Sequence, residues 1–324
     1  MIEVVKKIPS LLDFSQIAFR RGLLVKNEDE YLLQRLEAGA IGEEFVYASL
    51  KKYGCSHWQF FQNVWLDFYG TYESDMILLT NHAIYVFEIK NFDGTFEYEQ
   101  GQCRINGRVI ASNCVFQAER ALMNLQSICQ EISPNLPVRG ALLFVGEHNQ
   151  VSIKSKVNGI SVVTRNQLRD FIRRIAHEEA QSGRNSIDSS QLITQFEKYR
   201  IPNPFSPTSY TVDNLLKAKK GIYCKKCHGN DLRIRKAYVD CACGFQESRE
   251  EAVLRTICEY GTLVFGEDFL SRKHVYDFLG REVSRNYLIR LLKKHFPSYY
   301  GGRSTKYLNY KLPYSKINDY FELS

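Results

Sequence analysis

The stretch from Asp75 to Lys90, DMILLTNHAIYVFEIK, consists of two apolar runs on either side of Asn81-His82. Asparagine tolerates a positive φ, so this pair can form the two-residue turn of a β-hairpin. The turn sets the register of the two strands, in which Thr80 faces Ala83 and, counting outward, Asp75 faces Glu88.

The acidic residues of this hairpin predict a metal site. Directly opposed residues have Cβ atoms about 5 Å apart, and like charges at that distance repel each other. The carboxylates of Asp75 and Glu88, placed among apolar neighbours, therefore need a cation between them. Lys90 lies on the same face of its strand as Glu88, because side chains alternate along a strand. The alternative is that both acids lie at solvated strand ends, with Lys90 neutralising them or pairing with Glu73; the register and the apolar surroundings favour a catalytic site.

The composition, with 44% hydrophobic and 24% charged residues, is that of a soluble globular chain. Its length of 324 residues is enough for two or three domains. The first residues lack the apolar core of a signal peptide, and no apolar run approaches the roughly 20 residues that span a bilayer. Nine cysteines, an odd number, favour thiols and metal ligands over a disulfide framework. We therefore expect a cytoplasmic protein without a membrane partner.

The net charge of +7 is concentrated in the last part of the chain. Residues 203–324 contain 21 Lys and Arg against 13 Asp and Glu, whereas the residues before them are close to neutral. This asymmetry suggests that the C-terminal part binds a polyanion. A solvated basic surface is the alternative.

A helix is predicted on the N-terminal side of the hairpin. Residues 1–36 are expected to form helical segments that pack on the main domain. The next segment, Gly39–Leu50, has apolar residues at helical spacing and small residues at its start. Such a helix can lie close to a sheet and bring one acid, Glu43 or Glu44, to the open end of the hairpin. The alternative for these acids is a favourable interaction with the helix N-terminus.

Further strands and helices surround the hairpin. A second hairpin turn is predicted at Asn106-Gly107, within 103–110. Ser112 or Asn113 can cap a helix that extends to Glu131 and has Gln117 in its first turn. The remaining strands are predicted at 58–66, 138–146 and 160–164, and the remaining helices at 167–180 and 191–199. Apolar strands that alternate with helices indicate an α/β fold with a mixed sheet covered on both faces.

Residues of about 37–165 resemble a nuclease-related domain (NERD), a branch of the PD-(D/E)xK phosphodiesterase superfamily. The resemblance depends on Gly42-Glu43, Asp75, Glu88-Ile89-Lys90 and Gln117. It implies a restriction-endonuclease-like sheet, a divalent metal (Mg²⁺ or Mn²⁺) held by Glu43, Asp75 and Glu88, and a Lys90 that positions or activates the water. Members usually carry Asn-Pro before the helix that holds the Gln, whereas this chain has Ser112-Asn113-Cys114. The role of Gln117 therefore stays open.

Two cysteine pairs predict a structural zinc site. Cys224 and Cys227 are followed, after 13 residues, by Cys241 and Cys243. With the strand-like segment 232–239 between the pairs, this is the spacing of a Cys₄ zinc ribbon that binds Zn²⁺. The alternatives are a redox pair or incidental thiols, and His228 is a competing ligand.

The C-terminal residues predict three helices, at 250–259, 271–279 and 285–296, followed by two strands about Gly301-Gly302. This order resembles a winged helix-turn-helix, in which the third helix enters the major groove and the wing touches the DNA backbone. A small helical domain that binds a protein is the alternative. The candidate DNA-contacting residues on the third helix and the wing are Arg285, Asn286, Arg290, Lys293, Lys294, Arg303 and Lys306.

These patterns predict five segments: an N-terminal extension (1–36), a nuclease-like domain (37–200), a Pro-rich linker (201–220), a zinc ribbon (221–247) and a winged-helix-like domain (248–324). The function they favour is a metal-dependent nuclease that acts on DNA. A non-catalytic nucleic-acid-binding regulator or adaptor is the alternative, because a nuclease core can be vestigial; the presence of Asp75, Glu88 and Lys90 favours the enzyme. RNA as a substrate and the formation of a homodimer stay open.

Overall fold

The computed structural model describes residues 9–131, 136–181, 189–296, 298–301 and 304–308. These residues fall into two compact units, one formed by residues 35–204 and one formed by residues 9–34 together with 205–308. Among the described helices, none has the length and apolar character needed to cross a membrane.

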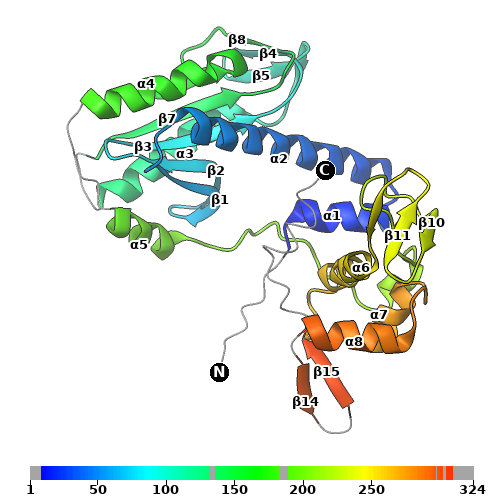
Figure 1. The fold of residues 1–324 in the computed structure, drawn as a ribbon. Coiled ribbons are helices and arrows are strands. Elements are labelled where there is room, and N and C mark those ends of the chain that lie inside the picture. Colours follow the sequence, from blue (N-terminus) through cyan, green and yellow to red (C-terminus); the bar gives the residue numbers. More distant parts are fainter. Residues whose placement is uncertain (1–8, 132–135, 182–188, 297, 302–303, 309–324) are drawn as a thin grey trace. The chain divides into compact units, whose positions relative to one another are not determined.

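The first unit is built on a five-stranded mixed sheet (Figure 1). Its strand order is β1-β2-β3-β7-β9, in which the first three strands are antiparallel and the last three are parallel. The strands are β1 (Gln59–Asp67), β2 (Thr71–Leu79), β3 (Ile84–Lys90), β7 (Val138–Phe144) and β9 (Ile160–Thr164). The predicted mixed sheet is confirmed.

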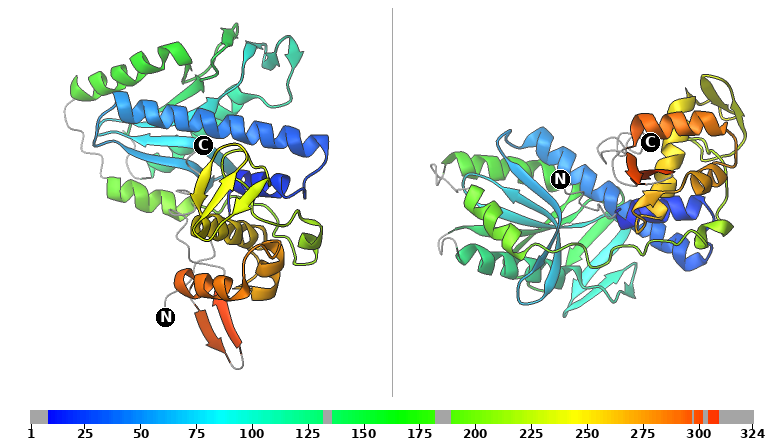
Figure 2. Two further views of the ribbon diagram at one scale, coloured as in Figure 1. Left: turned by 45° about the vertical axis from the view of Figure 1, so that its right-hand side comes forward. Right: turned by 90° about the horizontal axis from the view of Figure 1, so that it is seen from below.

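Helices cover both faces of this sheet (Figure 2). The apolar side chains Val46 and Phe171 belong to one core cluster, which α2 and α4 form with the sheet. Leu125 and Phe196 belong to the cluster on the other face, which α3 and α5 cover. The helices are α2 (Asn27–Tyr53), α3 (Cys114–Gln130), α4 (Leu168–Gln181) and α5 (Ser189–Tyr199), with a short 3₁₀ helix η1 (Arg165–Gln167) before α4.

A second, four-stranded sheet with the order β6-β5-β4-β8 extends this unit. Its predicted turn is confirmed, since Asn106 and Gly107 both have a positive φ, of 50° and 76°. The strands are β4 (Gly94–Glu99), β5 (Gln102–Ile105), β6 (Arg108–Val109) and β8 (Asn149–Ile153).

The predicted helix at Gly39–Leu50 is the middle of a much longer one. Helix α2 begins at Asn27, so Glu43 and Glu44 lie several turns from its N-terminus and do not interact with that end. The expectation of a helix start among the small residues was wrong, because residues 27–38 already belong to the helix, and Leu33 in this part is buried. The small residue that matters is Gly42. A Cβ at Gly42 would lie 2.6 Å from Asn91 Cβ, so glycine permits the helix to approach the end of β3.

The expectation that residues 1–36 pack on the nuclease-like domain was also wrong for the helix α1 (Leu11–Arg20). Its apolar residues Phe14 and Ile17 belong to the core of the second unit, together with Leu254 and Ile257 of α6. After the helix, Arg21 is 1% exposed and bonds to the Glu259 carboxylate. The partners that this segment requires are thus found in the C-terminal part of the chain.

The zinc-ribbon residues and the C-terminal helices share that core. Ile222 and Val239 lie in one cluster with Leu254 and Leu288. The predicted linker also contributes Leu215, from the 3₁₀ helix η2 (Asn214–Lys217). The elements are β10 (Leu232–Ile234), β11 (Tyr238–Cys241), β12 (Gln246–Ser248), α6 (Arg249–Leu263), β13 (Phe269–Leu270), α7 (Arg272–Phe278), α8 (Arg285–His295), β14 (Ser298–Gly301) and β15 (Ser304–Leu308).

Two local predictions can be compared with these elements. The strand expected at 232–239 is two strands, since a turn in which Arg235 N bonds to Tyr238 O separates β10 from β11. The three C-terminal helices are confirmed, with Ser248, Ser271 and Ser284 as their N-caps. A short strand that was not predicted, β13, joins the C-terminal hairpin in a sheet of order β13-β15-β14.

Candidate active site and zinc site

The predicted register of the β2–β3 hairpin is confirmed. The ladder pairs Leu79 with Ile84 and ends with Met76 opposite Phe87, so the next positions outward are Asp75 and Glu88. The turn differs from the prediction, because Asn81 is not among the residues with a positive φ. The Thr80 hydroxyl holds the turn instead: it donates to Ala83 O at 2.8 Å and accepts from Ala83 N at 2.9 Å.

Asp75, Glu88 and Lys90 meet where the ladder ends. The Asp75 carboxylate accepts a hydrogen bond from Ile89 N, with an Oδ2–N distance of 2.6 Å. Glu88 is 8% exposed, and its Oε1 lies 2.6 Å from Lys90 Nζ. The alternative of solvated strand ends therefore does not hold for Glu88, and Lys90 pairs with Glu88 rather than with Glu73.

The carboxylates of Asp75 and Glu88 repel each other, and the ammonium of Lys90 lies beside them. Burial and the Glu88 charge raise the pKa of Asp75 well above its ordinary value, against the opposing effect of Lys90. Burial disfavours the charged form of Lys90, but the Glu88 and Asp75 carboxylates outweigh it and raise the pKa of Lys90. The site is thus short of positive charge, which is the condition under which carboxylates bind a divalent ion.

The acid that α2 contributes is Glu43, whereas Glu44 is exposed. Burial raises the pKa of Glu43, and the charges of Lys90 and Glu88 act on it, which places it with the hairpin acids. Asn63 of β1 donates from Nδ2 to Glu43 Oε2 at 3.0 Å and so orients this carboxylate.

Glu73 is a further acid at this site that the sequence did not identify as a site residue. It precedes Asp75 by two positions in β2, so the two side chains share a face of the strand. Burial, followed by the charges of Glu43 and Glu88, raises the pKa of Glu73. The alternation of side chains along the strand was the available signal.

Gln117 lies one turn into α3, and its side chain is exposed. The predicted cap is Asn113, whose Oδ1 accepts from Phe116 N at 3.0 Å. Cys114, the first residue of α3, is close enough to Lys90 and Glu88 for their charges to act on its thiol. The beginning of α3 therefore lies near the acids, while the role of Gln117 stays a prediction.

Glu43, Asp75 and Glu88 supply the oxygen ligands that a hard divalent ion prefers, but in the described part of the chain their carboxylate oxygens do not all lie within 4.8 Å of one another, as the sulfur atoms of the four clustered cysteines do. Mg²⁺ and Mn²⁺ prefer carboxylate oxygens, and these three come from one helix and two adjacent strands. Burial and the Glu88 charge raise the pKa of Asp75, so a cation bound between the two acids would relieve their repulsion.

The four predicted zinc ligands form a cluster in which all sulfur atoms lie within 4.8 Å of one another. Cys224 Sγ is 3.7 Å from Cys243 Sγ, and Cys227 Sγ is 3.5 Å from Cys241 Sγ. Tetrahedral zinc with Zn–S bonds of about 2.3 Å separates its sulfur ligands by about 3.8 Å. The cluster therefore has the dimensions of a Cys₄ zinc site. The competing ligand, His228, lies outside this group, and its Nδ1 is 3.3 Å from Arg20 Nη1.

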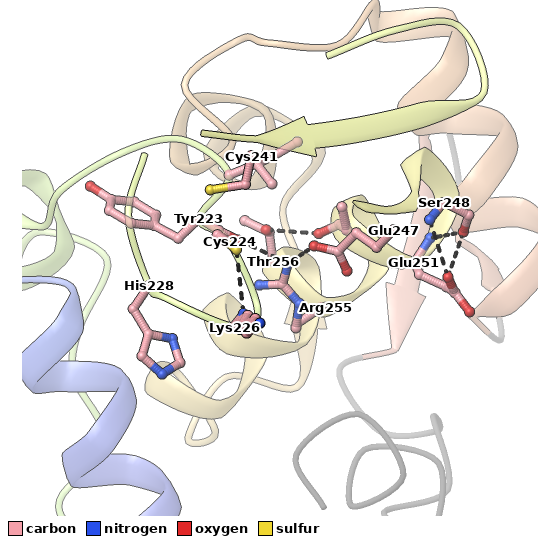
Figure 3. A network of polar contacts seen from close by, with 12 residues as sticks. Tyr223, Cys224, Lys226, His228, Cys241, Glu247, Ser248, Glu251, Arg255 and Thr256 are labelled. Atoms are coloured by element: carbon pink, nitrogen blue, oxygen red, sulfur yellow. Dashed lines mark hydrogen bonds and ion pairs between the residues drawn. The ribbon is translucent and has the colours of Figure 1, made fainter. Parts of the chain in front are cut away.

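Arg255 of α6 connects this helix to the segment that carries the four clustered cysteines (Figure 3). Its guanidinium donates to the backbone O of Tyr223, the residue before Cys224, at 2.8 Å and pairs with Glu247 of β12. Figure 3 also shows the cap of α6, where the Ser248 hydroxyl and the Glu251 carboxylate bond to each other.

The candidate DNA-contacting residues are exposed wherever the structure describes them. On α8, the Arg285 and Arg290 guanidinium groups lie over the rings of Tyr276 and Tyr287, at 5.2 and 5.1 Å from the ring centroids. Lys294 Nζ is 2.7 Å from Glu250 Oε1, so this lysine is already paired. Arg303 lies outside the described residues. The exposed residues are Arg285, Asn286, Arg290, Lys293, Lys294 and Lys306.

Comparisons with known proteins bear on the first unit. A search of curated proteins and a search of solved structures found no match. One family model matches, and it covers the helix segment with Glu43, the whole β2–β3 hairpin and Gln117. Residues 38–145 of this chain match the model of the nuclease-related domain, NERD, which indicates a nuclease-related function.

Proposed function

We propose that the protein is a metal-dependent nuclease that hydrolyses phosphodiester bonds in DNA. The observation that carries the proposal is the meeting of Asp75, Glu88 and Lys90 at the open end of a buried hairpin, inside the segment that matches a nuclease-related domain. Mutually repelling carboxylates are costly to the fold, so their presence beside a lysine favours a catalytic role.

Each residue has a role that follows from its position. Asp75, Glu88 and Glu43 would hold Mg²⁺ or Mn²⁺, which supplies charge stabilisation at the phosphate and lowers the pKa of water. Lys90, held by Glu88, presents an ammonium beside these acids and orients the attacking water or neutralises the scissile phosphate. Asn63 keeps Glu43 directed at the site.

The second unit would deliver the nuclease to DNA. Its zinc cluster, which we assign to Zn²⁺, stabilises the ribbon. The three helices α6, α7 and α8, followed by the β14–β15 hairpin, support the interpretation as a winged helix with α8 in the major groove. The exposed cationic residues of α8 would neutralise phosphates. A homodimer would allow both strands of a duplex to be cut.

A cleavage assay tests this proposal. Purified protein is incubated with supercoiled, linear and single-stranded DNA and with RNA, each in Mg²⁺, Mn²⁺ or EDTA. We expect cleavage of DNA in the presence of metal, and no cleavage in EDTA or by the variant Asp75→Asn. Binding of DNA without cleavage under all these conditions would favour the alternative, a non-catalytic regulator or adaptor, and preferential cleavage of RNA would correct the substrate.

A further inference from the structure

Three potential metal ligands lie together in the first unit, away from the proposed active site. They are Cys55 and His57, in the loop after α2, and Glu179 in α4, and their ligand atoms lie within 4.8 Å of one another. His57 Nε2 is 3.0 Å from Glu179 Oε1. Glu179 also accepts from the backbone N of Asn81 at the turn of the β2–β3 hairpin. Asp75 is six positions from Asn81, which at about 3.3 Å per strand residue separates this cluster from the active site by roughly 20 Å.

The loop that carries Cys55 and His57 is held in place by close packing. A Cβ at Gly54 would lie 2.3 Å from the Trp58 ring, so the glycine allows the ring to cover the loop. Trp58 N bonds to Cys55 O at 3.2 Å, which closes the loop as a turn. Cys55 packs against the core on its apolar side, while the His57 side chain is 46% exposed. The two side chains therefore flank a position that a small ion can reach from the solvent.

Glu179 is oriented as metal-bound carboxylates usually are. Its Oε2 accepts a hydrogen bond from Trp58 Nε1 at 2.8 Å, and only 9% of its side chain is exposed. Hydrogen bonds from outside the ligand set are the feature that fixes ligand orientation in metal sites.

We propose that Cys55, His57 and Glu179 bind a divalent ion of the zinc class, at a site distinct from both the Cys₄ cluster and the proposed active site. Thiolate, imidazole and carboxylate together suit Zn²⁺ or Co²⁺ and are a poor set for Mg²⁺. Three protein ligands leave a fourth position for water. The bound ion would tie the end of α2 to α4 and, through Glu179, to the hairpin turn.

Cobalt binding to the full-length protein tests this proposal, because cobalt bound to a thiolate absorbs in the near ultraviolet and cobalt bound only to carboxylates does not. The protein is first loaded with zinc at the Cys₄ cluster, and Co²⁺ is then titrated. Loading is limited to one equivalent of zinc per chain, which the four-thiolate cluster takes, and we then expect the thiolate band to develop with one added Co²⁺ per chain. Cys55→Ser should abolish the band, and His57→Ala should weaken the apparent affinity for Co²⁺ by at least about tenfold.

The matched control is His177→Ala, which removes a nearby exposed histidine of α4 that bonds to Gln181 instead of to this cluster. This variant should titrate like the wild type. A second readout is the melting temperature of protein that already holds one equivalent of zinc: further Zn²⁺ should raise it in the wild type and in His177→Ala but not in Cys55→Ser, since a ligand that binds the folded state stabilises it. Absence of the thiolate band in the wild type, or a band that survives in Cys55→Ser, would overturn the proposal.

Discussion

Replacing Lys90 by methionine should destabilise the metal-free protein, because Lys90 is the cation beside two carboxylates. Its Nζ lies 2.6 Å from Glu88 Oε1, and Glu88 is buried. Removing one partner of a buried ion pair typically costs 3–5 kcal/mol. Since 28% of the Lys90 side chain is exposed, we expect the lower end, about 3 kcal/mol in the free energy of unfolding. Methionine keeps most of the aliphatic length, so the loss reports the charge.

A bound divalent ion should restore part of the unfolding free energy that Lys90→Met loses in the absence of metal. A divalent ion at a hundred times its dissociation constant stabilises the folded state by about 2.7 kcal/mol. Urea unfolding in EDTA and in Mg²⁺ measures both effects, with the exposed Lys156→Met as the control that should stay within about 0.5 kcal/mol of the wild type. Lys90→Met should also lose about 10²–10⁴-fold in cleavage rate while it still binds metal. A Lys90→Met variant as stable as the wild type in EDTA would show that the acids are solvated and would refute this electrostatic account.

Further predictions concern pH, the zinc cluster, DNA and a buried ion pair. Because the pKa of Asp75 is raised in the folded state, the metal-free protein should lose stability as the pH rises from about 4 through the folded pKa, and Asp75→Asn should remove this slope; an unchanged slope in urea titrations would argue against it. Metal analysis should find about one tightly bound zinc per chain, and Cys241→Ser should release it and lower the melting temperature; full reactivity of all four thiols in the wild type would contradict the site. Arg290→Ala or Lys293→Ala should weaken duplex binding and reduce its salt dependence without changing metal binding at Asp75, as fluorescence anisotropy can measure; salt-independent binding would point to a protein partner. Arg21→Met should cost about 3–5 kcal/mol by leaving Glu259 short of a partner, and Arg21→Met with Glu259→Leu should restore most of it; a single variant as stable as the wild type would contradict the pairing.

The parts of the fold that the sequence predicted are those determined by local chemistry. The register of the hairpin followed from the number of residues between the Asn81-His82 turn and the two acids. The turn itself is held by the Thr80 hydroxyl and not by a positive φ at Asn81. The Asn106-Gly107 turn needs a backbone conformation that these two residues favour, so it was predicted correctly. The start of α2 was not predicted, since its first turn, 27–30, consists of polar residues alone and gives no apolar period.

The predictions that failed concern segments whose packing partners are distant in the sequence. The apolar face of α1 is visible in the sequence, but nothing there shows that the face covers α6 rather than the nuclease-like unit. The site residue Asn63 was missed for the same reason, because its role depends on strand β1 bringing it beside Glu43. Glu73 was missed although the alternation along β2 places it on the same face as Asp75.

The predicted zinc ribbon and the helices after it share one hydrophobic core. Val239 of the ribbon and Leu254 of α6 share a core, and Arg255 joins the backbone before Cys224 to β12. Removing the zinc would free the ribbon strands, expose that core and leave the Arg255 guanidinium without its carbonyl acceptor. Because a buried donor without an acceptor costs about 1–3 kcal/mol, the damage should extend from the ribbon into α6 and the elements packed on it. If α8 binds DNA as proposed, zinc at the four cysteines would thereby affect that binding, even though none of these cysteines lies on the helix.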